Sequence, residues 1–234
     1  MCTVTFLPLG QGDFIITSNR DERKTRNTIP PAPYNIFGTE VYFPKDTEAG
    51  GTWFAASKTY TLVLLNGAAH KHHHNPPYRK SRGLVMLDFF GYSNPAEYAY
   101  RYNFEGIEPF TLVIINPDLK TLHQFRWNEK MPELIEKDFE DSHIWSSATL
   151  YDSETRKRRE VWFEQWKNEG NEFTVDNILR FHHFGGTGNI ETDLVMNRSN
   201  RVQTVSISSF EKRHNVSTFC YEDLIENKRH TVIL

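Results

Sequence analysis

The sequence predicts an α+β protein built as a four-layer αββα sandwich, in which two β-sheets stack face to face and helices cover the outside. Two observations predict this architecture. Blocks of β-branched and apolar residues alternate with pairs of amphipathic segments, a pattern typical of sheets covered by helices. The strand pattern also continues on both sides of every Pro-rich stretch, and none of these stretches has the length of a linker. The 234 residues are therefore predicted to form a single domain, residues 1–234.

The first block of the chain is predicted to form four strands. Its apolar and β-branched runs are separated by Gly, Pro and Asn, which commonly end strands. The expected strands are residues 2–9, 13–18, 52–57 and 60–66. Two helices follow, because apolar residues recur three and four positions apart in 81–90 and 94–102, and Pro95 suits a first helical turn.

The second half of the chain repeats this alternation. The expected strands are residues 110–117, 121–127, 143–147, 202–210, 217–223 and 230–234. Between them, residues 153–168 and 174–184 are amphipathic, with Ser153 and Thr174 as expected N-caps. The Pro-rich segment 29–34 and the His-rich segment 70–80 are predicted to be loops.

Composition narrows the class of partner. A net charge of -3 gives no reason to expect a nucleic acid or a membrane surface, so a small-molecule ligand is expected. Two cysteines are too few for a disulfide framework and fit a reducing compartment. The start of the chain resembles no secretory leader, and no apolar run is long enough to span a bilayer. These features together predict a cytoplasmic protein.

Cys2 stands directly behind the initiator methionine. Methionine before a small residue is usually removed during synthesis, which would give Cys2 the α-amine of the chain. An unperturbed α-amine has a pKa of about 7.7 to 8.0 and an unperturbed thiol one of about 8.5, so the amine can serve as general base for its own thiol. Alternatively, Cys2 is an ordinary small core residue.

The run "SNRDE" supplies an arginine and a carboxylate near the start of the chain. Arg20 would stabilise a thiolate, and Asp21 would orient an amine by accepting its protons. Strand alternation puts the two side chains on opposite faces, so a turn would be needed to aim both at one point. The alternative is that the run is a solvated charged turn.

Together these stretches resemble a known family. "MC" at the start, "SNRDE", "GGTWFA" at residues 50–55, "HIWSSATLYD" and "RVQTVSIS" are similar to the NRDE family, which includes the transport and Golgi organisation 2 proteins. That family is similar in turn to the choloylglycine hydrolase and penicillin V acylase group of N-terminal-nucleophile hydrolases. The resemblance implies the αββα sandwich fold of those hydrolases, in agreement with the order of strands and helices.

The resemblance also implies roles for single residues. Cys2 matches the nucleophile, Arg20 the arginine that stabilises the thiolate, and Asp21 the carboxylate that binds the amine. Asn66 falls at a strand end where the acylases keep an Asn that stabilises the oxyanion. Arg201 resembles the late arginine that supports the nucleophile.

Two further residues are assigned to substrate binding. Ser147 stands where many relatives have a second oxyanion Asn, and its shorter hydroxyl predicts slower catalysis or a different substrate shape, since losing one such donor costs ~10² to 10³ in rate. Trp53 is either a core anchor or a wall of the pocket, and its large apolar surface favours the core.

The histidines are not expected to bind metal, and no cofactor is expected. His70, His72, His73 and His74 are nearly consecutive, so they point in different directions, whereas zinc sites combine separated elements. His182 and His183 end a helix, where the helix dipole favours a cation, which explains at least one of them without catalysis.

The sequence therefore predicts a Cys N-terminal-nucleophile amidohydrolase that cleaves a linear, non-peptide amide through a thioester on Cys2. The alternative is a non-catalytic lipid or haem carrier on the same fold, because members of the NRDE family have been linked to lipid and haem handling. A metal-binding protein that uses the His-rich loop ranks below both.

Overall fold

The structure, a computed structural model, describes residues 3–199 and 201–234. The chain forms two compact units. Unit 1 comprises Met1–Arg26, Glu140–Ser147 and Tyr151–Leu234, and unit 2 comprises Asn27–Phe139 and Ala148–Leu150. Each unit contains one seven-stranded sheet with helices on it, and every pairing of strands is antiparallel.

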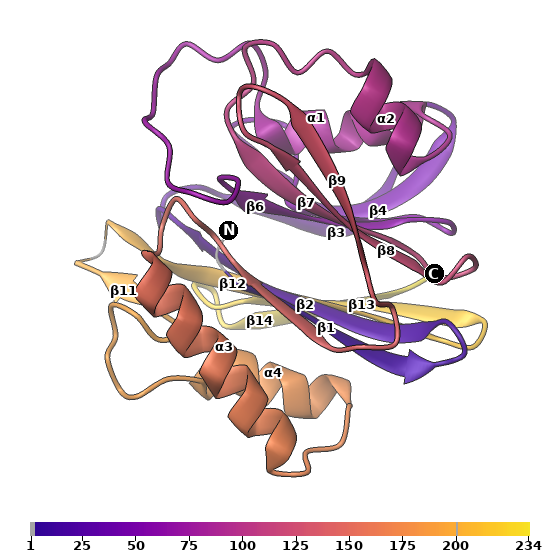
Figure 1. The fold of residues 1–234 in the computed structure, drawn as a ribbon. Coiled ribbons are helices and arrows are strands. Elements are labelled where there is room, and N and C mark those ends of the chain that lie inside the picture. The colour runs from indigo at the N-terminus through magenta and orange to yellow at the C-terminus, as the bar shows by residue number, and fades with distance from the viewer. Residues whose placement is uncertain (1–2, 200) are drawn as a thin grey trace. The chain divides into compact units, whose positions relative to one another are not determined.

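The sheet of unit 1 has the strand order β10-β1-β2-β12-β13-β14, with β11 paired to β12. Its strands are β1 (Thr3–Gly10), β2 (Asp13–Glu22), β10 (His143–Ser146), β11 (Asn197–Arg198), β12 (Val202–Arg213), β13 (Val216–Asp223) and β14 (Lys228–Ile233). Two helices, α3 (Ser153–Asn168) and α4 (Val175–Phe184), lie on one face of this sheet (Figure 1).

Aromatic and aliphatic side chains fix α3 and α4 to that face. Leu7 and Ile15 of the sheet share a buried cluster with Phe163 and Trp166 of α3 and Phe181 of α4. Burying side chains of this kind stabilises the fold by ~1.5 to 3 kcal/mol each. The helices therefore hold the first two strands in a fixed position.

The N-caps of these helices were predicted with one error. Thr174 caps α4, because its Oγ1 accepts the N–H of Asn177 at 3.2 Å. In α3 the capping residue is Asp152, whose Oδ1 accepts the N–H of Thr155 at 2.8 Å, so the expected cap at Ser153 is wrong. A carboxylate stabilises a helix start as well as a hydroxyl does.

The sheet of unit 2 runs in chain order from β3 to β9. Its strands are β3 (Thr28–Ile36), β4 (Thr39–Asp46), β5 (Phe54–Ala56), β6 (Thr61–Asn66), β7 (Phe110–Asn116), β8 (Thr121–Trp127) and β9 (Pro132–Lys137). The helices α1 (Arg82–Asp88) and α2 (Pro95–Arg101), with the short 3-10 helix η1 (Phe89–Gly91) between them, cover one face (Figure 1). Aromatic rings pack against this sheet. The ring centre of Phe104 lies 5.1 Å from that of Phe125 and 5.2 Å from that of Trp127, and both pairs are stacked.

The Pro-rich segment 29–34 corrects the sequence prediction. It is no loop, because it lies within β3. β3 is an edge strand, where one side of the backbone needs no partner and prolines are tolerated. Strands β4, β9 and β11 were also not predicted. The His-rich segment 70–80 is a loop, as expected.

The α+β class with two large antiparallel sheets is confirmed. Stacking of the two sheets into an αββα sandwich stays a prediction. None of the described helices is both long and apolar enough to cross a membrane.

Candidate functional site

The predicted site residues are divided between the two units. Unit 1 contains Arg20, Asp21, Ser147 and Arg201, and unit 2 contains Trp53 and Asn66. The predicted nucleophile, Cys2, lies outside the described residues. Its neighbour Thr3 is described and pairs with Asn19, two residues before Asp21.

Asp21 is the most completely bonded of these residues. Its side chain is buried at the end of β2, with 4 % of the residue exposed. The hydroxyl of Tyr151 donates to Oδ2 at 2.7 Å, and the hydroxyl of Thr204 donates to Oδ1 at 2.6 Å. Among the described residues, no basic side chain forms an ion pair with Asp21. A buried carboxylate held by two neutral donors retains a strong preference for a nearby cation.

Tyr151 connects Asp21 to a buried arginine. The guanidinium carbon of Arg159 lies 3.7 Å from the centre of the Tyr151 ring, and that of Arg198 lies 5.1 Å from it. Arg159 is fully buried in α3 and donates to the carbonyls of Thr192 and Asp193 at 2.9 and 2.7 Å. No acidic side chain among the described residues pairs with this arginine.

Arg159 also anchors the start of β1, because its Nη1 donates to the hydroxyl of Thr3. A single guanidinium therefore contacts both the ring that holds Asp21 and the residue that follows Cys2.

Arg20 points to the opposite face of the sheet from Asp21, as strand alternation requires. It is buried, with 3 % exposed, and its Nη1 lies 3.4 Å from the carbonyl of Arg26. It pairs across the strands with Ser206, whereas Asp21 pairs with Thr204. The register shifts between Thr204 and Ser206, so a bulge at Val205 sends these two hydroxyls to opposite faces.

The Arg20 face carries polar atoms that lack partners. Ser206 and Ser208 are fully buried, and neither hydroxyl forms a hydrogen bond within residues 3–199 and 201–234. Ser208 pairs with Ser18, so a row of hydroxyls borders Arg20. Buried hydroxyls without a hydrogen bond are rare in folded proteins. The hydroxyls of Ser206 and Ser208 therefore call for a polar partner on the Arg20 face.

Ser147 and Arg201 take different positions in unit 1. Ser147 is buried directly after β10, and its carbonyl accepts the N–H of Tyr151 at 3.2 Å, which links it to the Asp21 network. Arg201 is exposed in the turn between β11 and β12. Arg198, three residues earlier, lies nearer the Asp21 network, because its guanidinium carbon is 5.1 Å from the centre of the Tyr151 ring.

In unit 2, Asn66 is the last residue of β6 and is half-buried. Gly67 follows it with φ +82°, and a Cβ at Gly67 would stand 2.6 Å from the hydroxyl of Thr149, so only glycine fits this turn. Trp53 is buried with 3 % exposed, and its role as a core anchor or a wall of the pocket stays a prediction.

His182 is fully buried between α4 and the sheet. Asn19 donates to the carbonyls of His182 and Leu194 at 3.2 and 2.9 Å, so its amide oxygen accepts from Nδ1 of His182. Nε2 then accepts from the hydroxyl of Thr5 at 2.7 Å. Burial lowers the pKa of His182 to about 3, and the charges of His183 and Arg159 act in the same direction. A neutral ring gains nothing from the helix dipole, so the dipole does not account for His182, and the expectation that it accounts for at least one of the two histidines stays a prediction for His183.

The histidine loop is held by hydrogen bonds to Glu108. His72 Nε2 and His74 Nδ1 lie 3.1 and 3.2 Å from Oε1, and Arg82 lies 3.1 Å from Oε2. In the part of the chain that the structure describes, no group of three or more His, Cys, Asp or Glu side chains could hold a metal ion.

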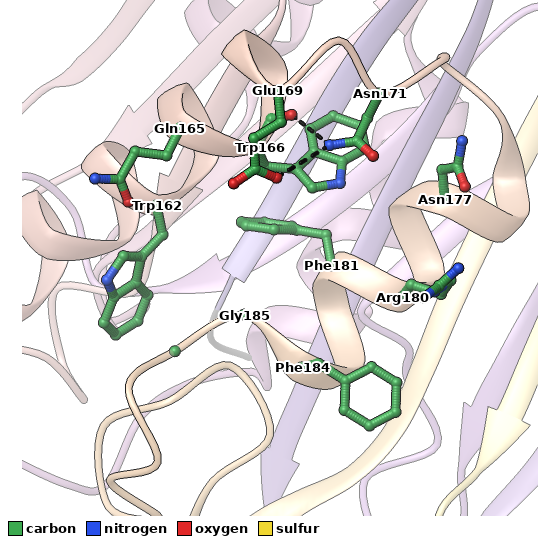
Figure 2. A pocket seen from close by; sticks show the side chains of 11 residues that line it. Trp162, Gln165, Trp166, Glu169, Asn171, Asn177, Arg180, Phe181, Phe184 and Gly185 are labelled. Atoms are coloured by element: carbon green, nitrogen blue, oxygen red, sulfur yellow. Dashed lines mark hydrogen bonds between the residues drawn. The ribbon is translucent and has the colours of Figure 1, made fainter.

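A groove of about 400 Å³ lies between α3 and α4 in unit 1. Its floor is aromatic, with Trp166 and Phe181 buried, and Phe184 is 81 % exposed at its edge. Figure 2 shows Trp162 and Gln165 projecting from α3 on one side and Arg180 and Phe184 from α4 on the other. None of the predicted site residues lines this groove.

Sequence reasoning missed Tyr151, Arg159 and Thr204. Tyr151 stands directly before the N-cap Asp152, and only the folded chain brings it to Asp21. Arg159 belongs to a charged helix whose other basic residues are mostly at the surface.

Comparison with known proteins bears on the family. A search of curated proteins found no match. The profile of a family described as transport and Golgi organisation 2 matches residues 1–217, nearly the whole chain. The chain therefore belongs to the transport and Golgi organisation 2 family.

Proposed function

We propose that this chain is a Cys N-terminal-nucleophile amidohydrolase that acts on a linear, non-peptide amide. One observation carries the proposal: the Asp21 carboxylate is buried and held by two hydroxyls, and no basic side chain among the described residues forms an ion pair with it. A buried anion is costly unless a cation lies nearby. The protonated α-amine of a processed Cys2 would supply that cation.

The reaction follows from the two groups on Cys2. The thiol proton first passes to the α-amine, which gives a thiolate and the ammonium that lies beside Asp21, and Sγ then bonds to the amide carbon. The amine then returns that proton to the leaving nitrogen as the carbon–nitrogen bond breaks, which leaves a thioester. Water adds to the thioester, and its products are a carboxylic acid and the free thiol. Arg20 favours the thiolate through its charge, and Asp21 orients the amine.

Asn66 and a backbone N–H are assigned to the oxyanion, with Ser147 as a second, shorter donor. Arg201 supports the nucleophile in this proposal, although its exposed position in unit 1 leaves Arg198 as an alternative for that role.

The test uses N-acyl p-nitroanilides with acetyl, phenylacetyl and decanoyl groups. The wild-type protein should release p-nitroaniline, and Cys2→Ala should abolish the release. Cys220→Ala is the matched control, because Cys220 is buried and burial raises the pKa of its thiol. Equal hydrolysis by wild type and Cys2→Ala would refute the proposal.

The groove between α3 and α4 favours a second candidate, a non-catalytic carrier of lipid or haem. Its aromatic floor suits an apolar ligand, and it contains no nucleophile. A carrier has no need of an activated thiol. Binding of a fluorescent fatty acid that is lost in Trp162→Ala and unchanged in Cys2→Ala, without amide hydrolysis, would establish this candidate instead.

A further inference from the structure

We propose that Tyr151 is a positioning residue for the N-terminal cysteine, one that holds the Asp21 carboxylate in the orientation the α-amine requires. This inference rests on the proposed function. Tyr151 contacts Asp21 and not the substrate, so its effect on the reaction is indirect.

The first step of the argument is the fixed geometry of the carboxylate. Each oxygen of Asp21 accepts one short hydrogen bond, from Tyr151 at 2.7 Å and from Thr204 at 2.6 Å. Thr204 is itself fixed, because its hydroxyl also accepts the N–H of Met196 at 2.9 Å. Hydrogen bonds from two different parts of the chain prevent the Asp21 carboxylate from rotating. The lone pairs that accept neither hydroxyl are therefore held in a fixed orientation.

The second step is the fixed geometry of Tyr151. Its N–H donates to Ser147, its ring lies against the guanidinium of Arg159 at 3.7 Å, and 3 % of the residue is exposed. A cation over the ring draws electron density from the phenol and strengthens the hydrogen bond that it donates. Arg159 therefore supports Asp21 through Tyr151.

The third step connects this network to Cys2. Arg159 donates to Thr3, which directly follows Cys2, so one buried guanidinium fixes both the chain beside the nucleophile and the ring that holds Asp21. Loss of the Tyr151 hydroxyl should leave the ring on Arg159 in place and free one oxygen of Asp21. The protonated amine would then be less well aimed at the leaving group.

The test compares an amide with an ester. A p-nitroanilide needs a proton on its leaving nitrogen, whereas p-nitrophenolate leaves without one. Tyr151→Phe should lower kcat for the anilide by about tenfold or more and change kcat for the matching p-nitrophenyl ester by less than about threefold, since general acid catalysis is worth ~10² to 10⁴. Tyr98→Phe is the control, because Tyr98 also loses one buried hydrogen bond, from its hydroxyl to the carbonyl of Val85 at 3.1 Å.

A second pair of variants protects the test against misfolding of Tyr151→Phe. Thr204→Val removes the other hydroxyl from Asp21 and should lower the anilide-to-ester ratio, whereas Thr204→Ser keeps it and should restore the ratio. Anilide and ester rates that fall by the same factor in Tyr151→Phe would overturn the positioning role alone. If hydrolysis by the wild-type protein does not depend on Cys2, the proposed function is overturned as well. That result comes from comparing wild type with Cys2→Ala and needs no Tyr151 variant.

Discussion

At the scale of single residues, the run "NRDE" separates into two buried environments. Asn19 and Asp21 face the helices of unit 1, where His182, Tyr151 and Thr204 bind them. Arg20 faces the other side of the sheet, beside Ser206. The two charges that the proposed chemistry needs are adjacent in sequence and held by different neighbours, so their roles can be separated by mutation.

Arg20→Ala tests the electrostatic role of the arginine. Arg20 should lower the pH at which iodoacetamide labels Cys2 to below the free-thiol value of about 8.5, and the variant should raise that midpoint. A change of one unit in the pKa of the Cys2 thiol corresponds to about 1.4 kcal/mol of differential stabilisation of the thiolate. Labelling is followed by peptide mass spectrometry, with Arg23→Ala, a surface arginine, as control. The same midpoint in both variants would make Arg20 a structural residue.

Asp21→Asn tests the orienting role of the carboxylate. The amide has the size of the carboxylate, and its nitrogen can donate to the Tyr151 or Thr204 hydroxyl, which turns to accept. Hydrolysis of the p-nitroanilide should therefore fall by ~10² or more while the melting temperature changes little. An Asp21→Asn protein that unfolds, or that keeps full activity, would show that this carboxylate serves the fold alone.

At the scale of elements, α4 places a neutral histidine against the sheet. The pKa of His182 is about 3 in the folded protein and 6.5 ordinarily, so the unfolded chain binds one more proton between those values. The contribution of His182 to stability is therefore greatest above pH 6.5 and falls as the pH decreases toward 3. From pH 7 to pH 5 the loss should be about 2 kcal/mol.

Urea unfolding of the wild type and of His182→Gln at pH 7 and pH 5 measures how much of this loss is due to His182. The variant should be less stable at pH 7, and its stability should depend less on pH. The control is His73→Gln, which removes an exposed histidine of the loop 70–80 and should keep the pH dependence of the wild type. If both variants lose as much stability as the wild type between the two pH values, His182 does not titrate as stated.

The loop between β6 and α1 is the second element with a testable property. His72 and His74 are engaged by Glu108, so a chelator should change neither the melting temperature nor any amide hydrolysis. The measurement is a thermal melt with and without EDTA, on protein made without a His tag. Stoichiometric zinc in such protein, lost on replacing His72 and His74, would contradict the prediction.

At the scale of the whole molecule, the sequence predicted the strands with clear apolar alternation and the long amphipathic helices. The sequence did not predict strands whose residues lack the usual apolar alternation. The prolines of β3 resemble a loop, yet an edge strand accepts them. None of the residues of β9 is buried, so its sequence lacks the apolar alternation of a core strand.

The candidate site could be predicted in part. Arg20, Asp21 and Ser147 were assigned by resemblance and stay predictions, whereas the opposite faces of Arg20 and Asp21 follow from strand alternation. The role of Thr204 depends on the bulge at Val205, because regular alternation would put Thr204 on the face of Ser206. Tyr151 and Arg159 meet Asp21 only after α3 packs on the sheet, a long-range contact that no local pattern contains.

The central claim is that Cys2 acts with a free α-amine, and the intact mass of native protein expressed without an N-terminal extension tests it most directly. Methionine should be absent, with Cys2 as the first residue, and a version with residues added before Cys2 should fold and fail to hydrolyse the p-nitroanilide. Protein that retains Met1 and still hydrolyses the amide would contradict the claim, because a peptide-bonded nitrogen cannot act as the base.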